Sequence, residues 1–365
     1  MRELDQIRVK INDIDREMAA LFQQRMELSA QVAAFKKERG LSIRDSERER
    51  ELIDRNRSYI ADETVCSYYV QFMRSVIDLS CAYQGRLMEG MQVAYCGAEG
   101  AYAYIAARRM FPDAKLISYP DFTAAYRAVE NGEMDSVVLP LENSYAGEVG
   151  TVMDLLFSGE LFINQVMDMD VSHSLLGVES ATAATIKTVL SHPQALHQCD
   201  DYIRCRGLDT ESCSNTALAA RHVRQANDPS LGAIASEAAA AIFGLQVLDR
   251  DINTAKNNTT RFAALSRAQN RPDGARKRAD ENFVLVFTVQ NDAGSLAQTL
   301  NIIGAHGYNM RTLRSRPMKD LSWQYFFYVE AEGSINTTNG REMMQELSAT
   351  CAKLRLVGSY YANNV

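Results

Sequence analysis

Apolar side chains recur along residues 1–39 in steps that alternate between four and three. The segment contains neither proline nor glycine, and this spacing is the heptad rhythm of a helix that packs along one seam. The pattern predicts one long α-helix with the seam Ile7, Ile11, Ile14, Met18, Leu21, Leu28, Val32 and Phe35. The one seam position without an apolar side chain is held by Arg25.

Two further helices are expected before residue 91. Gly40 is a typical C-terminal stop, and Ser46 with Glu49 fits a capping box that opens the second helix. The third helix is predicted from about Asp62 to Gly90. A first helix of this length would extend roughly 60 Å, more than the core of a small globule covers. We therefore expect residues 1–90 to form an all-α unit that pairs with a second copy of itself.

From residue 91 the pattern changes to short β-rich runs that alternate with helical runs, as far as residue 267. This alternation is typical of an α/β domain. Residues 268–281 are polar, contain Pro272 and Gly274 and show no apolar period, so they are predicted to be a linker. Residues 282–365 follow the order strand, helix, strand, strand, helix, strand. This βαββαβ order predicts a ferredoxin-like α+β domain.

The composition of the 365 residues, 46% hydrophobic and 23% charged, is that of a folded globular protein. A net charge of -7 disfavours a general grip on nucleic acid or an anionic membrane. The seven cysteines include no CxxC pair, which argues against a disulfide framework and a zinc site. The N-terminus is charged and no run is long enough to span a bilayer, so we expect a cytoplasmic protein.

Arg25 within the apolar seam has two interpretations, because a buried guanidinium needs a partner. It could form a buried ion pair with Glu27 or Glu49, or it could bind an anionic ligand. Lys36 lies close to three helical turns further along nearly the same face, roughly 16 Å away. The two cations could therefore converge on one small anion.

Residues 1–90 resemble the all-helical, intertwined-dimer class of chorismate mutase, most recognisably in the string IRDSERERELI. The resemblance implies a site built from Arg8, Arg25, Lys36, Asp45, Arg48, Glu49, Ser80 and Gln84. The arginines would hold the two carboxylates of chorismate, while Lys36 and Gln84 donate to its ether oxygen as the bond breaks. Arg8 lies roughly 25 Å from Arg25 along the helix, so it would serve the partner's site.

Three stretches of residues 91–267 gather hydrogen-bonding groups beside predicted strand ends: PLENSYAG at 140–147, SHPQAL at 191–196 and NNTTRF at 257–262. Ligand sites of α/β folds form at such ends. Glycines at 97 and 100 precede a predicted helix whose amides could hold an anion. An ordinary turn would explain NNTTRF or the glycines equally well. No GxGxxG fingerprint is present, so a nicotinamide site is not supported.

Together these strings resemble prephenate dehydratase, with Thr-Arg-Phe as the hallmark. The resemblance implies a two-lobed, periplasmic-binding-protein-like fold with the site in its cleft. Thr260 would donate to the leaving hydroxyl of prephenate, and Arg261 would bind a carboxylate. The pocket would be shaped by Gly97, Gly100, Glu142, Asn143, Ser144 and Phe262, with Asn215 and Thr216 further candidates. His192 is either a general acid or a structural hydrogen-bonding residue.

Residues 282–365 resemble an ACT domain of the phenylalanine-binding kind. The implied regulatory residues are Gly294, Ser295, Leu296, Asn309, Ser315, Arg316 and Pro317. Arg314 departs from the family's ESRP element, where a glutamate stands, and this reverses a charge near the expected ligand. The domain therefore either senses an amino acid or serves dimerisation and stability alone.

The expected protein is a homodimeric or larger enzyme of phenylalanine biosynthesis. It converts chorismate to prephenate and prephenate to phenylpyruvate, with phenylalanine as effector and without metal or organic cofactor. One alternative is a non-catalytic sensor of prephenate or an aromatic amino acid. Another is a mutase fused to a prephenate dehydrogenase, which the missing dinucleotide fingerprint opposes.

Overall fold

The computed structural model describes residues 2–255, 257–269, 281–318 and 324–361. The chain divides into two compact units, Met1–Gln92 and Val93–Val365. The regions expected to be an α/β domain and a ferredoxin-like domain therefore fall within one unit. Most of the expected linker, residues 270–280, lies outside the described residues.

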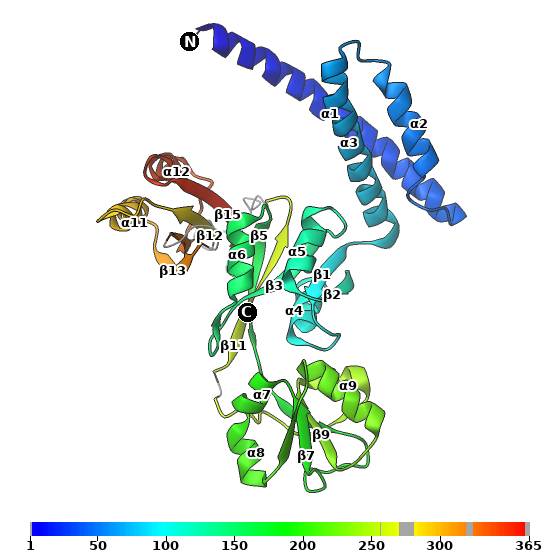
Figure 1. The fold of residues 1–365 in the computed structure, drawn as a ribbon, viewed down its shortest axis with the longest axis vertical. Helices are drawn as coiled ribbons and strands as arrows, with labels where there is room; N and C mark the ends of the chain where they lie inside the picture. The colour runs from blue at the N-terminus through cyan, green and yellow to red at the C-terminus, as the bar shows by residue number, and fades with distance from the viewer. Residues whose placement is uncertain (1, 256, 270–280, 319–323, 362–365) are drawn as a thin grey trace. The chain divides into compact units, whose positions relative to one another are not determined.

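The first unit consists of α1 (Arg2–Arg39), α2 (Ser46–Arg57) and α3 (Glu63–Glu89), seen in Figure 1. Asp62 caps α3 by accepting from the amides of Thr64 and Val65 at 2.8 and 3.1 Å. The cap of α2 is Asp45, whose Oδ1 accepts from the Arg48 amide at 3.0 Å. The expected capping box at Ser46 is therefore wrong: the cap is Asp45, one residue earlier, and Arg48 then stands at the third helical position where a capping box needs Glu or Gln.

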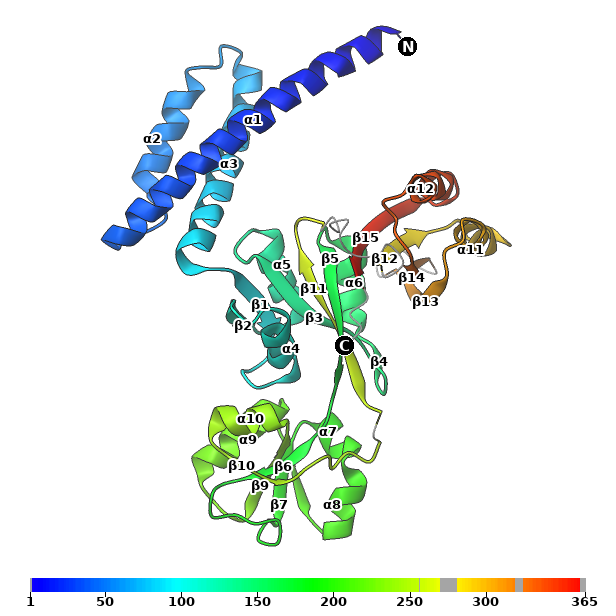
Figure 2. The same cartoon turned by 180° about the vertical axis from the view of Figure 1, so that it is seen from behind.

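The face of α1 that packs against the rest of its own unit is not the face that carries the heptad seam. Ala33 and Ser29 are buried at 1% and 8% exposure, and α1 contacts α3 where the two helices cross (Figure 2). The apolar seam residues are between 43% and 63% exposed, from Val32 to Leu21. Three helices of one chain therefore leave an apolar stripe along α1 uncovered.

The second unit begins with a lobe whose strands form one end of a mixed sheet. Its strands are β1 (Gln92–Cys96), β2 (Lys115–Tyr119), β3 (Ser136–Asn143), β5 (Phe162–Asp170) and β11 (Thr259–Ser266), with β4 (Gly147–Glu148) paired to β3. Its helices are α4 (Tyr102–Met110), α5 (Phe122–Glu130) and α6 (Gly150–Ser158). Strand β11 pairs antiparallel with both β3 and β5. Both neighbours therefore set its register, and with it which side chains point to each face of the sheet.

A second lobe is inserted between β5 and β11. Its sheet has the order β10-β6-β9-β7-β8. The strands are β6 (Ser174–Gly177), β7 (Thr188–Ser191), β8 (Asp209–Ser212), β9 (Leu231–Ala235) and β10 (Gln246–Asp249). Helices α7 (Pro193–Gln198) and α8 (Asp200–Arg206) lie on one side of it, and α9 (Thr216–Ala226) and α10 (Glu237–Phe243) on the other, as Figure 2 shows. The chain passes twice between the lobes, once after β5 and once before β11.

The C-terminal region has the expected βαββαβ order. Its elements are β12 (Glu281–Thr288), α11 (Ser295–Ala305), β13 (Met310–Pro317), β14 (Tyr325–Glu332), α12 (Thr338–Thr350) and β15 (Lys353–Tyr361). The strands lie in the order β13-β14-β12-β15, and the helices pack against each other. Its core includes Phe283, Phe287, Val329 and Leu347, each fully buried.

This C-terminal sheet continues directly into the sheet of the first lobe. Strand β15 pairs with β5 at Gly358 and Ile163, which makes one sheet of both regions. A Cβ on Gly358 would lie 2.1 Å from the Ile163 carbonyl oxygen, so only glycine permits this approach. Phe157 of α6 stacks on Phe326 with ring centroids 4.3 Å apart. These contacts explain why the two regions form one compact unit.

Among the described residues, no helix is both long and apolar enough to cross a membrane.

Replacing Gly358 by alanine tests the sheet junction. Because the new Cβ would collide with backbone, we expect the second unit to lose about 1–3 kcal/mol of unfolding free energy. The control is Gly304→Ala in α11, where a Cβ meets nothing within 4 Å. Alanine in a helix should there stabilise by up to about 1 kcal/mol. Thermal unfolding measures both, and an unchanged midpoint for Gly358→Ala would contradict the junction.

Candidate functional site

The helical unit places a guanidinium between α1 and α3. The Arg25 Nη1 donates to Ser80 Oγ and, at 3.4 Å, to the Val76 carbonyl oxygen. Burial lowers the pKa of Arg25 from its usual value, with a nearby Cys81 acting in the opposite direction. Neither carboxylate considered from the sequence is its partner, because Glu27 accepts from Gln23 at 3.1 Å and Glu49 pairs with Arg44 at 3.4 Å. Within the described residues of this chain, Arg25 therefore forms no ion pair with either carboxylate.

Several of the expected mutase residues gather around Arg25. Ser80 and Gln84 are buried one turn apart on α3, and Gln84 Oε1 has no hydrogen-bond partner among the described residues. Lys36 donates to the Ile43 carbonyl oxygen. The Cys81 thiol, one residue beyond Ser80, lies close enough to Lys36 and Glu49 for both to act on its pKa. The unit thus brings Arg25, Lys36, Glu49, Ser80 and Gln84 into one neighbourhood.

The remaining three expected mutase residues lie elsewhere in a single chain. Asp45 is engaged as the cap of α2. Arg48 is exposed and lies 3.6 Å from Glu51. Arg8 is exposed near Asp5 at 3.7 Å, on the part of α1 whose seam is uncovered. One chain alone therefore does not complete the expected set.

In the second unit, one pocket of about 300 Å³ is lined by residues of both lobes. The first lobe contributes Asn143 and Thr260 from the neighbouring ends of β3 and β11. The second contributes His173, His192, Gln198, Asn215 and Thr216, among others. The pocket also includes Tyr102 and the turn Ala146–Val149. It lies where the stretches PLENSYAG, SHPQAL and NNTTRF meet.

Hydrogen bonds fix the direction of the Thr260 hydroxyl. Asn143 Oδ1 accepts from the amides of Tyr145 and Ala146 at 3.0 and 2.9 Å, an Asx turn that orients the side chain. Its Nδ2 consequently faces β11 and donates to Thr260 Oγ1 at 2.9 Å and to Asn258 Oδ1 at 2.7 Å. Because Thr260 Oγ1 accepts from Asn143, the hydroxyl proton of Thr260 remains for another acceptor.

His173 is the most buried ionisable group of the pocket, at 2% exposure. Its Nε2 lies 2.9 Å from Gln198 Oε1, which can only accept, so the proton is on Nε2. Burial lowers the pKa of His173, against the smaller opposite effect of Gln198. The ring is therefore neutral near pH 7, and Nδ1 lies 3.4 Å from the Tyr102 hydroxyl. Tyr102 itself donates to the Ser172 carbonyl oxygen.

The described lining residues include no lysine or arginine, although the resemblance implies an anionic ligand. Helix starts supply the positive potential instead. The first residues of α4 and α9 line the pocket, as do His192, which caps α7, and Val149, directly after which α6 begins. Neither α4 nor α6 has a side-chain cap, so their first amides are open to an anion. Glu148 is the one carboxylate among the described lining residues.

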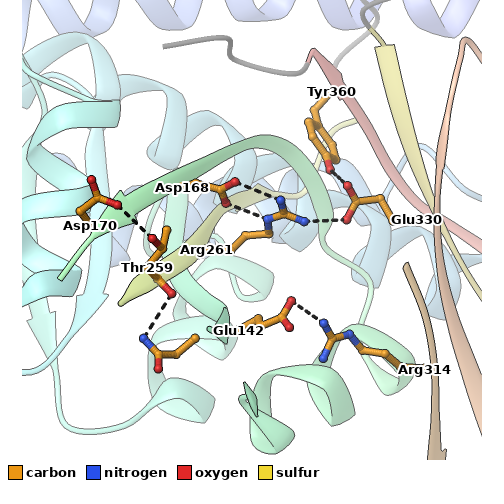
Figure 3. A network of polar contacts seen from close by, with 9 residues as sticks. Glu142, Asp168, Asp170, Thr259, Arg261, Arg314, Glu330 and Tyr360 are labelled. Carbon is orange, nitrogen blue, oxygen red and sulfur yellow. Dashed lines mark hydrogen bonds and ion pairs between the residues drawn. The ribbon is translucent and has the colours of Figure 1, made fainter. Parts of the chain in front are cut away.

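Arg261 lies on the opposite face of β11 from Thr260, because neighbouring residues of a strand point to opposite faces. Its Nε and Nη2 donate to Asp168 at 2.7 and 3.0 Å, and Nη1 lies 3.3 Å from Glu330 Oε2 (Figure 3). The hydrogen bonds to Asp168 raise the pKa of Arg261. This corrects the expectation that Arg261 meets the ligand beside Thr260.

Other expected pocket residues are also used elsewhere. Glu142 pairs with Arg314 of β13, and Ser144 bonds to the backbone of residues 257 and 259. Phe262 is core, at 2% exposure. Gly97 and Gly100 adopt positive φ in the turn before α4 but do not line the pocket, where Ala101 stands in their place. Asn143 and Thr260 remain from the expected set, and His192, Asn215 and Thr216 join them.

The sequence interpretation missed His173, Gln198 and Tyr102. His173 has no local signal, because it stands between two serines directly before β6 and belongs to none of the candidate motifs. Gln198 ends the short helix that His192 opens, and Tyr102 is the first residue of α4 after the glycine turn. These two could have been found by asking which side chains share a helix with the candidate motifs.

In the C-terminal region, the two expected regulatory elements lie at the same end of the sheet. The register aligns Phe287 near the end of β12 with Phe327, and Phe327 with Ser315 near the end of β13. Gly294 has a φ of 90° and precedes α11, while Asn309 donates to Glu332 at 3.0 Å. Arg316 is engaged by Glu148 and Asp154, both at 2.8 Å, and so is not turned to an effector.

Fold and pocket together define a two-unit protein: a helical unit with a half-buried cation, and a two-lobed small-molecule enzyme with an appended ferredoxin-like domain. A family profile described as "Chorismate mutase type II" matches residues 7–85, and one described as "Prephenate dehydratase" matches residues 93–270. The chain belongs to the family of bifunctional chorismate mutase/prephenate dehydratases.

Three relatives carry this assignment. The Escherichia coli K12 bifunctional chorismate mutase/prephenate dehydratase is 29% identical over 98% of this chain and 96% of its own length. The Arabidopsis thaliana chloroplastic arogenate dehydratase/prephenate dehydratase 1 is 34% identical over 74% of this chain and 72% of its own. The prephenate dehydratase of Arthrobacter aurescens in complex with L-Phe has a TM-score of 0.68 and 26% identity over 74% and 90%.

The protein is therefore an enzyme with two activities: it rearranges chorismate to prephenate and converts prephenate to phenylpyruvate. The match to the dehydratase profile decides against the alternative of a fused dehydrogenase. Its bifunctional relatives favour catalysis over a sensor without activity.

The buried His173 predicts a pH effect on stability. Its native pKa lies below the ordinary 6.5, so between these two values the unfolded chain holds a proton that the native protein does not. The stabilisation is complete above pH 6.5 and is lost as the pH falls below it. Between about pH 7.5 and about pH 5.5, urea midpoints should fall more for the native protein than for His173→Gln. Equal falls in both proteins would rule out a buried neutral His173.

Proposed function

We propose that the mutase reaction takes place at the cluster of Arg25, Lys36, Glu49, Ser80 and Gln84. The rearrangement of chorismate needs no nucleophile, so a site that holds the compact conformer and stabilises the developing negative charge suffices. Arg25 supports this proposal because it is half-buried and no described carboxylate pairs with it. Lys36 and Gln84 would donate to the ether oxygen as its bond breaks, and Glu49 would hold the substrate hydroxyl.

The mutase site is proposed to be completed by a second chain. The uncovered seam of α1 and the position of Arg8 on it both support a homodimer in which Arg8 enters the partner's site. Asp45 and Arg48 would contribute polar contacts from the start of α2. An open groove of about 790 Å³ between α2 and α3 offers space for part of the partner's first helix.

For the dehydratase, we propose that prephenate lies in the pocket between the lobes. Prephenate must lose carbon dioxide and hydroxide together, so the enzyme has to assist a poor leaving group and restrain two carboxylates. The observation that carries the proposal is the Asn143 to Thr260 hydrogen bond, which leaves the Thr260 proton for the leaving hydroxyl. The amides at the starts of α4, α6 and α9 would receive the carboxylates.

We further propose that phenylalanine regulates the dehydratase through the ferredoxin-like region, acting as an ACT domain. The L-Phe complex of the Arthrobacter aurescens enzyme supports this, as does the position of Gly294–Leu296 and Ser315 at one end of the sheet. Arg314 faces Glu142, so its departure from the family pattern has a partner within the chain. A cytoplasmic location is proposed as well, in keeping with cysteines that form no disulfide.

Single substitutions should separate the two activities. Lys36→Gln removes the positive charge that would stabilise the developing negative charge, so mutase turnover should fall by roughly 100- to 1000-fold while dehydratase turnover on supplied prephenate stays normal. Thr260→Val should have the reverse effect of similar size. Both activities are assayed on the same preparations. Loss of both activities in either variant would contradict separate sites.

Charge on the seam of α1 should dissociate the dimer. Leu21 is 63% exposed in one chain, so Leu21→Glu would leave the unit folded but remove about 1.5–3 kcal/mol of apolar burial per chain from the interface. Gln23→Glu adds the same charge on the opposite side of α1 and serves as control. Sedimentation should show dissociation, and mutase turnover should fall, for Leu21→Glu only. An unchanged assembly would remove the seam from the interface.

Phenylalanine should inhibit the dehydratase and leave the mutase unaffected in the same preparation. Effector coupling typically changes affinity by roughly 5- to 150-fold. Titrating phenylalanine to millimolar concentration into the phenylpyruvate assay measures this directly. No response would assign the C-terminal domain to assembly and stability alone.

A further inference from the structure

Strands β3 and β11 connect the pocket to the C-terminal domain through two neighbouring cross-strand pairs. Thr260 lies opposite Asn143, and Arg261 lies opposite Glu142. Because side chains alternate along a strand, the first pair faces the pocket and the second faces away from it. Both members of the second pair contact the C-terminal domain (Figure 3).

The contacts of the second pair are ion pairs of opposite polarity: in one the lobe supplies the acid, and in the other it supplies the base. Glu142 of the lobe pairs with Arg314 of β13, while Arg261 of the lobe pairs with Glu330 of β14 at 3.3 Å. Glu330 is 2% exposed and also accepts from the Tyr360 hydroxyl at 2.7 Å. A carboxylate buried this deeply needs its cation, so Arg261 and Glu330 hold each other in place.

Arg316, two residues beyond Arg314 on the same face of β13, strengthens the connection. It donates to Glu148 of β4 and Asp154 of α6. Glu148 pairs in register with Glu142, and a Cβ on Gly150 would lie 2.6 Å from the Arg316 guanidinium. Because Gly150 has no side chain, the Arg316 guanidinium can pack against the hairpin of β3 and β4.

We propose that Glu142 and Arg261 are positioning residues of the dehydratase, through which the C-terminal domain holds Asn143 and Thr260 in their reactive arrangement. The proposal rests on the proposed function in one respect, that Thr260 acts on prephenate. It assigns the C-terminal domain a direct part in the unregulated reaction, through the Glu142–Arg314 and Arg261–Glu330 ion pairs.

The physical reason is the stiffness of paired strands. Glu142 and Asn143 are consecutive residues, as are Thr260 and Arg261, so a displacement at the ion pairs is passed along one peptide bond to the pocket. Displacing a reacting group by about 1 Å can cost roughly 100-fold in rate. An effector that shifts the C-terminal domain would act on turnover through the same contacts.

The variants Glu142→Gln, Arg314→Gln and their combination test the proposal in the full chain. Each single change should lower the dehydratase kcat roughly 10- to 100-fold, with KM nearly unchanged. The double variant should be no worse than the single ones, because all three lose the same ion pair. Arg261→Lys keeps the charge but not the bidentate geometry and should lie between these variants and the native protein.

The matched control is Arg311→Gln. Arg311 is on the same strand β13, and its ion pair with Glu332 at 3.5 Å stays within the C-terminal domain. Its dehydratase activity should equal that of the native protein. Mutase turnover in every variant reports on folding and concentration, and thermal unfolding identifies variants that lose activity through instability.

Three results would overturn the proposal: a native kcat in both single variants, losses that match a loss of thermal stability, or an equal loss in Arg311→Gln. Thr260→Val separates the proposal from the function on which it rests. If Thr260→Val is inactive while the ion-pair variants are normal, only the positioning role fails. If Thr260→Val is fully active, the proposed function of the pocket fails too.

Discussion

The antiparallel pairing of β11 with β3 is the constraint on which the dehydratase part of the structure depends. It places the Asn143–Thr260 hydrogen bond on one face and the Glu142–Arg261 pair on the other. A one-residue slip of this register would exchange the two faces and put charged side chains into the pocket. Strand β5 pairs with the other edge of β11 and fixes the same register from that side.

The two proposed sites offer different sources of positive charge to an anionic substrate. The helical unit uses cationic side chains, and Arg25 is half-buried with a hydroxyl and a carbonyl as acceptors. The dehydratase pocket offers the starts of several helices, whose amides carry partial positive charge without a side chain. Arg261 and Arg314 instead pair with acidic groups across the junction between the lobe and the C-terminal domain.

Much of this organisation follows from the sequence. The helices of the first unit and the βαββαβ order are set by local periodicity, and both are confirmed. The opposite directions of Thr260 and Arg261 could also have been predicted, because NNTTRF enters a strand in which neighbours must diverge. The partner of Arg314 could not, because Glu142 lies far away in the sequence and meets it only when the two sheets join. The role of His173 could not be predicted either, since its pocket exists only when the two lobes meet.

The most direct test of this account is a crystal structure of the protein with an unreactive analogue of prephenate. We predict that the analogue lies between the lobes with its hydroxyl against Thr260 Oγ1 and its carboxylates on the amides that begin the helices. Arg261 should stay between Asp168 and Glu330. An Arg261 side chain turned onto a carboxylate of the analogue, with both ion pairs broken, would contradict the account.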